Sequence, residues 1–443
     1  MPVRMRATVV SRSDLPRPRL QKGRHPTRLA TLAAALACGL ALTLAVPRRA
    51  AASPPDLFGF GSRSPAMAST GVSFADDYEA TYLNPAGLAR ARQRSLVLGV
   101  QGGAYHYELD DSVMAMSPVK SMTIGGTVPL PFGGLMKDRL TLGLGIYTPL
   151  DVVIVGDIDY AYRPRPIVLD RAQSLAVQVG LGIDLHGLVD GLRVGASLTA
   201  LGSFTGSIVA GIDPTGRFGS VVETQVVSSF APIVGASYDV GDLSFGAVWR
   251  GRIESDFVLQ IVTRDLPLTV PVLSIGGIAQ YDPHTFVLEA SWRPTPALLV
   301  ALGASYALWS EYPGPLIPTS LGSPVPPAAN FSNTLTPRIA AEYTYRRGRT
   351  ATRLRLGYAY VPSPAPDARA EARYLDNDRH LVTGGLGVDV ALGHHGAHVF
   401  FDSYVSLSVL PTRTHDAPAP DSTSDMRTSG FVGVGGWSGG VAW

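Results

Sequence analysis

The sequence predicts an all-β fold, a transmembrane antiparallel β-barrel of about 14 strands. Three observations support this prediction. Only 16% of the 443 residues are charged, whereas soluble proteins average about 25%. The 48 glycines and 35 prolines favour strands and turns over helices. No run of 18 apolar residues follows residue 46, and without spanning helices a chain crosses a bilayer only as a closed barrel, because every backbone polar group must be satisfied internally.

Residues 1–52 are expected to form a signal peptide outside the fold. A basic stretch ending at Arg28 precedes an apolar run from Leu29 to Val46, and small residues follow at 50–52. This layout is typical of a cleaved secretory signal. The apolar run is close to the minimum length of a spanning helix, so a membrane anchor is the alternative. The one cysteine, Cys38, lies inside the run, and we interpret it as a small residue there rather than as a lipid-attachment site.

Removal of residues 1–52 leaves 27 basic and 34 acidic residues. The exported chain therefore has a net negative charge. Nucleic-acid binding requires a surplus of basic residues, so this class of partner is excluded.

Alternating side chains predict the wall strands. Residues 139–147, 192–199 and 353–360 each place apolar side chains on one face and polar or small side chains on the other. The outward residues of the first example are Leu140, Leu142, Leu144 and Ile146, and the inward ones are Thr141, Gly143 and Gly145. Alternation over stretches of about ten residues is the signature of a transmembrane β-strand.

Fifteen ranges have this character, and bacterial barrels have an even number of strands. The ranges are 94–107, 119–129, 138–148, 172–185, 191–209, 221–239, 242–258, 269–281, 284–293, 297–310, 335–346, 351–361, 379–392, 396–410 and 428–443. The strand ending at Trp309 must run outward, so the three ranges between 269 and 310 must reduce to two. Fourteen strands result, with sixteen as the alternative.

Loop lengths give the orientation of the barrel. Short connections at 346–349, 238–242 and 393–396 should be periplasmic turns. Long segments at 149–170, 311–334, 362–378 and 411–427 should face outward. The last strand carries Phe431, Trp437, Val441 and Trp443 on one face. A terminal aromatic residue there is typical of the signal that the barrel assembly machinery of the outer membrane recognises, so we expect an outer-membrane location.

The segment before the barrel resembles the amino-terminal hatch of the FadL-type outer-membrane transporters of long-chain fatty acids and aromatic hydrocarbons. The matching residues are Gly59-Phe60-Gly61-Ser62-Arg63, Ala66-Met67, Gly71, Ala75-Asp76-Asp77, Tyr82 and Asn84-Pro85-Ala86-Gly87-Leu88. Further similar stretches are Leu140 to Pro149, Trp309-Ser310-Glu311-Tyr312 and Asp376-Asn377-Asp378-Arg379. The sequence departs from the family at Ala68-Ser69, where two glycines are common, and at 284–293, which has no clear counterpart.

The resemblance implies three parts: a signal peptide at 1–52, a hatch at 53–93 and an outer-membrane barrel at 94–443. It also implies uptake of hydrophobic compounds such as long-chain fatty acids or aromatic hydrocarbons, with release by movement of the hatch, sideways into the membrane. The partners are a hydrophobic small molecule and outer-membrane lipid, the chain is a monomer, and no cofactor or enzyme activity is implied. The alternative is a non-transport scaffold, such as a docking protein for secretion, on the same fold.

Candidate ligand-binding and gating residues lie in two segments. The hatch contributes Phe58, Phe60, Asn84, Pro85 and Ala86, where Asn84-Pro85 holds a sharp turn because proline fixes its own φ and asparagine bonds local backbone. A purely structural turn is the alternative. The apolar loop from Pro149 to Pro166 is expected to capture ligand, or else to fold as a lid without ligand. Its candidate residues are Val153, Val155 and Tyr160.

Other chemistries fit poorly. The residues His394, His395 and His398 flank a short turn and alternate in direction, so no metal site is expected. The glycine-rich run at 433–440 precedes no helix. A phosphate loop and a GxSxG nucleophile elbow both need a helix directly after the motif, so neither a phosphate site nor a serine hydrolase of that type is expected there. Five charged residues are expected to face the lumen as a structural ladder, with an arginine that binds a substrate carboxylate as the alternative. They are Arg338, Glu342, Arg353, Arg355 and Asp389.

Deletion of Trp443 is expected to impair assembly, because it removes the terminal aromatic residue of the last strand. The measurement is the amount of heat-modifiable protein in the outer-membrane fraction. Recovery of the unaltered protein entirely from the soluble periplasmic fraction would contradict the barrel prediction itself.

Overall fold

The computed structural model describes residues 58–443 apart from 115, 117, 135–136, 151–153, 156–164, 167–172, 213–217, 265–272, 315, 318–328, 367–373, 394–395 and 417–424. The predictions for residues 1–52 fall outside these residues. Among them, no helix is both long enough and apolar enough to cross a membrane.

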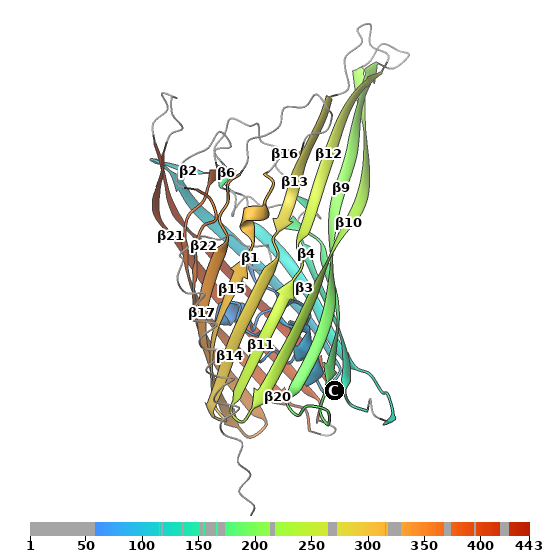
Figure 1. Ribbon diagram of the computed structural model, residues 1–443, viewed down its shortest axis with the longest axis vertical. Coiled ribbons are helices and arrows are strands. Elements are labelled where there is room, and N and C mark those ends of the chain that lie inside the picture. Colours follow the sequence, from blue (N-terminus) through green and yellow to red (C-terminus); the bar gives the residue numbers. More distant parts are fainter. Residues whose placement is uncertain are drawn as a thin grey trace, which may run out of the picture. The chain divides into compact units, whose positions relative to one another are not determined.

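Fourteen strands close into an antiparallel β-barrel, as predicted (Figure 1). Closure is direct, because β1 pairs with β3 on one side and with β22 on the other. The wall strands are β1 (Ser95–Leu109), β3 (Val119–Pro129), β4 (Leu140–Pro149), β8 (Ala176–Asp184), β9 (Leu192–Ile212), β10 (Phe218–Val240), β11 (Leu243–Arg250), β14 (Thr285–Thr295), β15 (Leu298–Ala307), β17 (Thr334–Arg347), β18 (Thr350–Val361), β20 (Arg379–Ala391), β21 (His398–His415) and β22 (Met426–Ala442).

Two strand positions are interrupted partway up the wall. Strand β12 (Ile253–Arg264) follows β11, and β13 (Leu273–Asp282) precedes β14. The break between β13 and β14 falls at Pro283, which has no N–H to donate to a ladder. The ranges 269–281 and 284–293 thus occupy one strand position, and the reduction to fourteen strands is confirmed. Above the break, β12 pairs with β13 and also lies parallel to the upper part of β9.

Short elements lie in the connections and in the amino-terminal part. The short strands are β2 (Ser112–Met114), β5 (Ile154–Val155), β6 (Arg165–Pro166), β7 (Gln173–Ser174), β16 (Leu316–Ile317) and β19 (Tyr374–Leu375). The short helices are η1 (Pro65–Met67), α3 (Ala80–Leu83), η2 (Pro85–Arg90) and η4 (Trp309–Glu311).

The two faces of the wall differ in the predicted manner. On β18, Leu354 and Leu356 are 57% and 69% exposed, whereas Arg355 between them is 2% exposed. On β22, Phe431 and Trp437 are about half exposed, as is Trp443 directly after the strand. An apolar outer face around a polar or small-residue interior is the arrangement of an outer-membrane barrel, so the chain is a multi-pass outer-membrane β-barrel.

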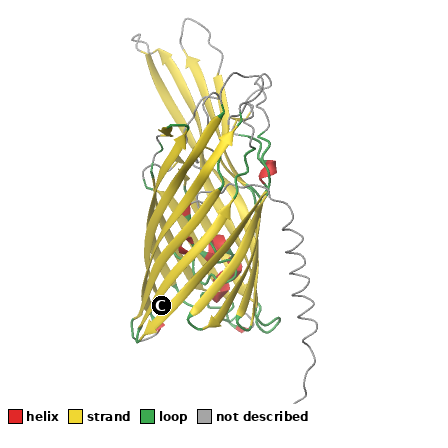
Figure 2. Cartoon of the chain, turned by 90° about the vertical axis from the view of Figure 1, so that its left-hand side faces the viewer, coloured by secondary structure: helices red, strands yellow, loops and turns green. Residues whose placement is uncertain are grey.

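The short turns lie together at the end of the barrel where the chain terminates (Figures 1 and 2). Gly241 and Gly348 have φ values of 58° and 60° in two of these turns, a conformation that glycine adopts without steric cost. The four long connections predicted to face outward lie partly outside the described residues. Their described parts, including η4, lie toward the opposite end, so the predicted division between short turns and long loops is observed.

Candidate functional site

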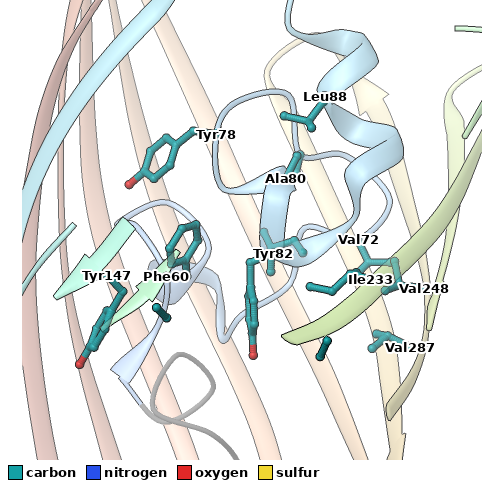
Figure 3. Close-up of a cluster of buried hydrophobic side chains, with 14 of the residues drawn as sticks. Phe60, Val72, Tyr78, Ala80, Tyr82, Leu88, Tyr147, Ile233, Val248 and Val287 are labelled. Atoms are coloured by element: carbon teal, nitrogen blue, oxygen red, sulfur yellow. The ribbon is translucent and has the colours of Figure 1, made fainter. Parts of the chain in front are cut away.

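Residues 58–93, which we call the inner segment, lie inside the barrel. Figure 2 shows the short helices of this segment enclosed by the wall strands. Its apolar side chains share a core with inward wall residues, and Figure 3 shows the rings of Phe60 and Tyr82 among wall side chains such as Tyr147 and Ile233. The ring centroids of Phe60 and Tyr82 are 5.8 Å apart. The inner segment is therefore packed as part of the folded protein.

Inward glycines of the wall allow the backbone of the inner segment to approach. A Cβ atom at Gly195 would overlap backbone atoms of Pro85 and Ala86. The same relation holds for Gly246 and the backbone of Val72. Gly182 and Gly357 also face backbone atoms of the inner segment. A Cβ atom at five further wall glycines would instead overlap side chains of that segment; these are Gly125, Gly143, Gly145, Gly235 and Gly385. We call these nine wall residues the glycine seat.

Asn84 ties the inner segment together and to the wall. Its side chain is fully buried. The Nδ2 group donates to the carbonyl of Val72 at 2.6 Å and to that of Ala236 on β10 at 3.0 Å, while Oδ1 accepts the N–H of Ala86 at 3.1 Å. Asn84 is the N-cap of η2, and Pro85 occupies the first position of that helix, where its missing N–H costs nothing. The amide group thus satisfies three backbone groups at the turn that the sequence predicted.

Glu289 of β14 binds the loop before α3. Its carboxylate accepts the N–H of Gly71 at 3.0 Å, the N–H of Ser73 at 2.9 Å and the hydroxyl of Ser73 at 2.7 Å. The residue is 6% exposed. Without this carboxylate, two buried N–H groups would lose their acceptor, which typically costs about 1–3 kcal/mol each.

A chain of charges connects the inner segment to three wall strands. Arg63 binds Glu342 of β17 at 3.1 Å and Asp76 at 2.7 Å. Glu342 also accepts from Arg355 of β18 at 2.7 Å, and Arg355 binds Asp402 of β21. Burial alone would lower the pKa of Arg63, but Glu342 and Asp76 raise it well above its ordinary value.

Arg353, Asp389 and His398 form a separate group near the chain end. Arg353 and Asp389 lie 3.4 Å apart, and His398 lies 3.0 Å from Asp389. Four of the five residues predicted for the luminal ladder thus occur in two groups. The fifth, Arg338, donates a hydrogen bond to Ser305 at 2.7 Å.

A buried carboxylate organises the start of the inner segment. Glu79 accepts the N–H groups of Ser62 at 2.8 Å, Arg63 at 2.9 Å and Ser64 at 2.8 Å. Burial raises the pKa of Glu79, and these hydrogen bonds oppose the rise. The loop at 62–64 is thereby closed onto residue 79, which fixes the position of Arg63.

Ion pairs link the other end of the inner segment to the base of the wall. Arg90 binds Asp239 of β10 at 2.7 Å, and Arg92 binds Asp184 of β8 at 2.7 Å. Arg193 of β9 lies between the two carboxylates and pairs with both. This end of the segment is held by charge, in addition to the apolar packing farther up.

A cavity of about 80 Å³ lies between the inner segment and the upper wall. Its lining includes apolar side chains such as Ile233, Ile253 and Leu381. It also includes polar ones such as Ser305 and Arg338, which are joined by a 2.7 Å hydrogen bond. Ala307 belongs both to the cavity lining and to the edge of an aromatic cluster. The rings of that cluster are Tyr281, Trp309, Tyr312 and Phe331.

The structure buries five of the predicted site residues and leaves three undecided. Phe58, Phe60, Asn84, Pro85 and Ala86 are all buried in the inner segment. The side chains of Val153, Val155 and Tyr160 fall outside the described residues, although the backbone at 155 pairs with 173 in a short ladder. His394 and His395 also fall outside them. No cluster that could hold a metal ion occurs among the residues described.

Sequence reasoning missed most of the cavity. None of the five buried candidates lines it, whereas Ala68, Ser69 and Tyr82 of the same segment do. On the wall, Arg338 was singled out, but Arg250 and Arg379 were not. The sequence signal for such cavity-lining wall residues is a single arginine at an inward position of a strand whose side chains alternate between apolar and polar.

No family model and no curated protein matches this sequence. Solved structures do match. A FadL homologue from Pseudomonas aeruginosa is 14% identical with a TM-score of 0.58, and the match covers 86% of this chain and 97% of that chain. The toluene transporter TodX from P. putida is 15% identical with a TM-score of 0.53, covering 87% and 98%. These similarities show that the chain has the FadL-type fold, as its sequence predicted.

Replacement of Gly195 by Ala is expected to displace the inner segment, because the added Cβ meets the backbone of Pro85 and Ala86 rather than a flexible side chain. Ion conductance in planar bilayers should rise, while heat-modifiable migration should persist. Gly433→Ala is the matched control, since a Cβ there meets no atom within 4 Å. Equal conductance of the two variants would show that the glycine seat does not hold the segment.

Proposed function

We propose that this protein takes up hydrophobic compounds across the outer membrane and that the inner segment is its hatch. The observation that carries the proposal is the cavity between the hatch and the upper wall, whose lining combines apolar side chains such as Ile233 and Ile253 with polar ones such as Arg338. Such a combination suits a molecule with an apolar body. The printed names of the similar structures, a FadL homologue and a toluene transporter, support the same class.

The cavity is too small for the proposed ligands without a movement. Ligand pockets typically measure about 300–1,000 Å³, and this one measures about 80 Å³. The proposal therefore takes this structure as the closed state. The hatch is held by hydrogen bonds, ion pairs and packing rather than by a disulfide. Its displacement would therefore enlarge the cavity without breaking a covalent bond.

Capture from outside remains assigned to the apolar loop at 149–166, with Val153, Val155 and Tyr160 as its proposed contacts. Burial of one such side chain typically contributes about 1.5–3 kcal/mol, so a few together would hold an acyl or aromatic ligand at micromolar affinity. Ligand would then pass to the cavity and the hatch, where Asn84 holds the closed turn. Release would go sideways through the wall.

A non-transport scaffold is the second candidate, and one observation favours it. The lumen around the hatch is filled, since the glycine seat is in contact with hatch atoms. A docking protein would need a plugged barrel of this kind and no ligand cavity. Mass spectrometry of lipids and hydrocarbons retained by the purified protein separates the two candidates, because only a transporter is expected to retain a specific apolar ligand.

Filling the cavity should abolish uptake. Ile233→Trp places a large ring in the cavity, and Val234→Trp places the same ring on the lipid-facing side of the same strand, where Val234 is 48% exposed. Uptake of radiolabelled oleate and toluene should fall to background in the first variant only. Both variants should keep heat-modifiable migration. Undiminished uptake of both probes by Ile233→Trp would refute the assignment of the cavity to the transport path.

A further inference from the structure

Two consecutive hatch residues adopt a backbone conformation that their side chains disfavour. Ala68 and Ser69 have φ values of 53° and 59°. A residue with a Cβ meets its own following carbonyl in this left-handed region, whereas glycine does not. The other non-glycine residues with positive φ in the described part of the chain are Asp110, Asp138 and Asn330, all of types that tolerate the conformation. The Ala68–Ser69 pair is therefore strained.

Hydrogen bonds from the wall and from the hatch itself hold the backbone of this pair and of the residues just before it. Thr383 of β20 accepts the N–H of Ala68 at 3.0 Å and donates to the carbonyl of Ala66 at 3.0 Å. Gly357 of β18 leaves the space that the backbone of Ala68 occupies. Ser69 donates its N–H to the carbonyl of Ser64 at 2.8 Å.

The wall also fixes the chain immediately after the pair. Glu289 holds the N–H groups of Gly71 and Ser73. The strained pair thus lies between an anchor on β20 and an anchor on β14. Unfavourable backbone angles persist only where the surroundings over-determine them, and two anchors within six residues meet that condition.

The strained pair also lines the cavity. Ala68 and Ser69 are the hatch residues on its lining between the two anchors, and Ser305 and Arg338 of the wall belong to the same lining. A molecule that enters the cavity therefore touches the one stretch of the hatch whose closed conformation is costly. Because the cavity is smaller than an acyl or aromatic ligand, such a molecule favours a state in which this stretch has moved.

We propose that Ala68–Ser69 is the trigger of the hatch. Its strain raises the free energy of the closed state, so that a ligand in the cavity needs to supply less to open it. This inference rests on the proposed function, since it assumes that the hatch opens for a ligand. It assigns the opening step to a defined pair of residues in the lining of the cavity.

A single thiol reports hatch opening. In a Cys38→Ser background, Ala75→Cys introduces one cysteine into the hatch, where Ala75 is 5% exposed. The rate of its reaction with a water-soluble maleimide, in protein reconstituted into phospholipid vesicles, measures how often the hatch opens. Adding Ala68→Gly and Ser69→Gly relieves the strain of the closed state, so the rate without ligand should fall by roughly tenfold.

The matched control is Ala80→Gly in the same background. Ala80 lies in the right-handed helix α3, so this change removes a methyl group and adds flexibility without relieving left-handed strain. Its reaction rate should stay equal or rise. A ligand-free rate in the double-glycine variant that equals or exceeds that of the background protein would overturn the proposal, whatever the ligands do.

Oleate and toluene form the second arm. Either probe should accelerate maleimide reaction in both proteins, and at equal probe concentration the double-glycine variant should still react roughly tenfold more slowly than the background protein. If neither probe accelerates the reaction or enters cells, the proposed uptake function fails. If a probe accelerates the reaction and brings the double-glycine variant to the same rate as the background protein, uptake stands and the trigger is refuted.

Discussion

The structure depends on one constraint: the backbone of a plug without regular structure must find hydrogen-bond partners inside a closed barrel. In the wall, the ladders between strands pair the backbone N–H and C=O groups. The inner segment has only short helices and turns, which leave more of these groups without a backbone partner. The wall meets this need in two ways. Its inward glycines let the hatch backbone approach, as Gly195 does for Pro85. Its buried side chains replace water as partners, as Glu289 does for Gly71 and Ser73.

The barrel was predictable because it follows from local pattern. Side chains that alternate with a period of two, with an apolar outer face, specified the strands and their faces. The rule that bacterial barrels have an even number of strands then reduced the number of strand positions around Pro283. The site was predictable only in part. Asn84-Pro85 was recognised from its turn chemistry, but the strain at Ala68 and Ser69 was not, because φ is set by anchors at Thr383 and Glu289, more than 200 positions away.

Charge and strain act in opposite directions on the hatch. The chain from Arg63 through Glu342 and Arg355 to Asp402 favours the closed state, since opening would separate buried opposite charges. The left-handed pair at 68–69 disfavours it. Under the proposed function, a plug held by both would be closed at rest without being locked. Purely apolar packing around Phe60 would hold the plug without such a release point.

Hydrogen exchange of the hatch amides tests the central claim most directly. If wall side chains hold the hatch, the amides of Gly71 and Ser73 should exchange as slowly as those of neighbouring wall strands in the intact protein. Glu289→Ala should speed exchange at these two amides while the wall amides stay protected. Rapid exchange of Gly71 and Ser73 in the unaltered protein, at the rate of solvent-exposed loops, would contradict the account.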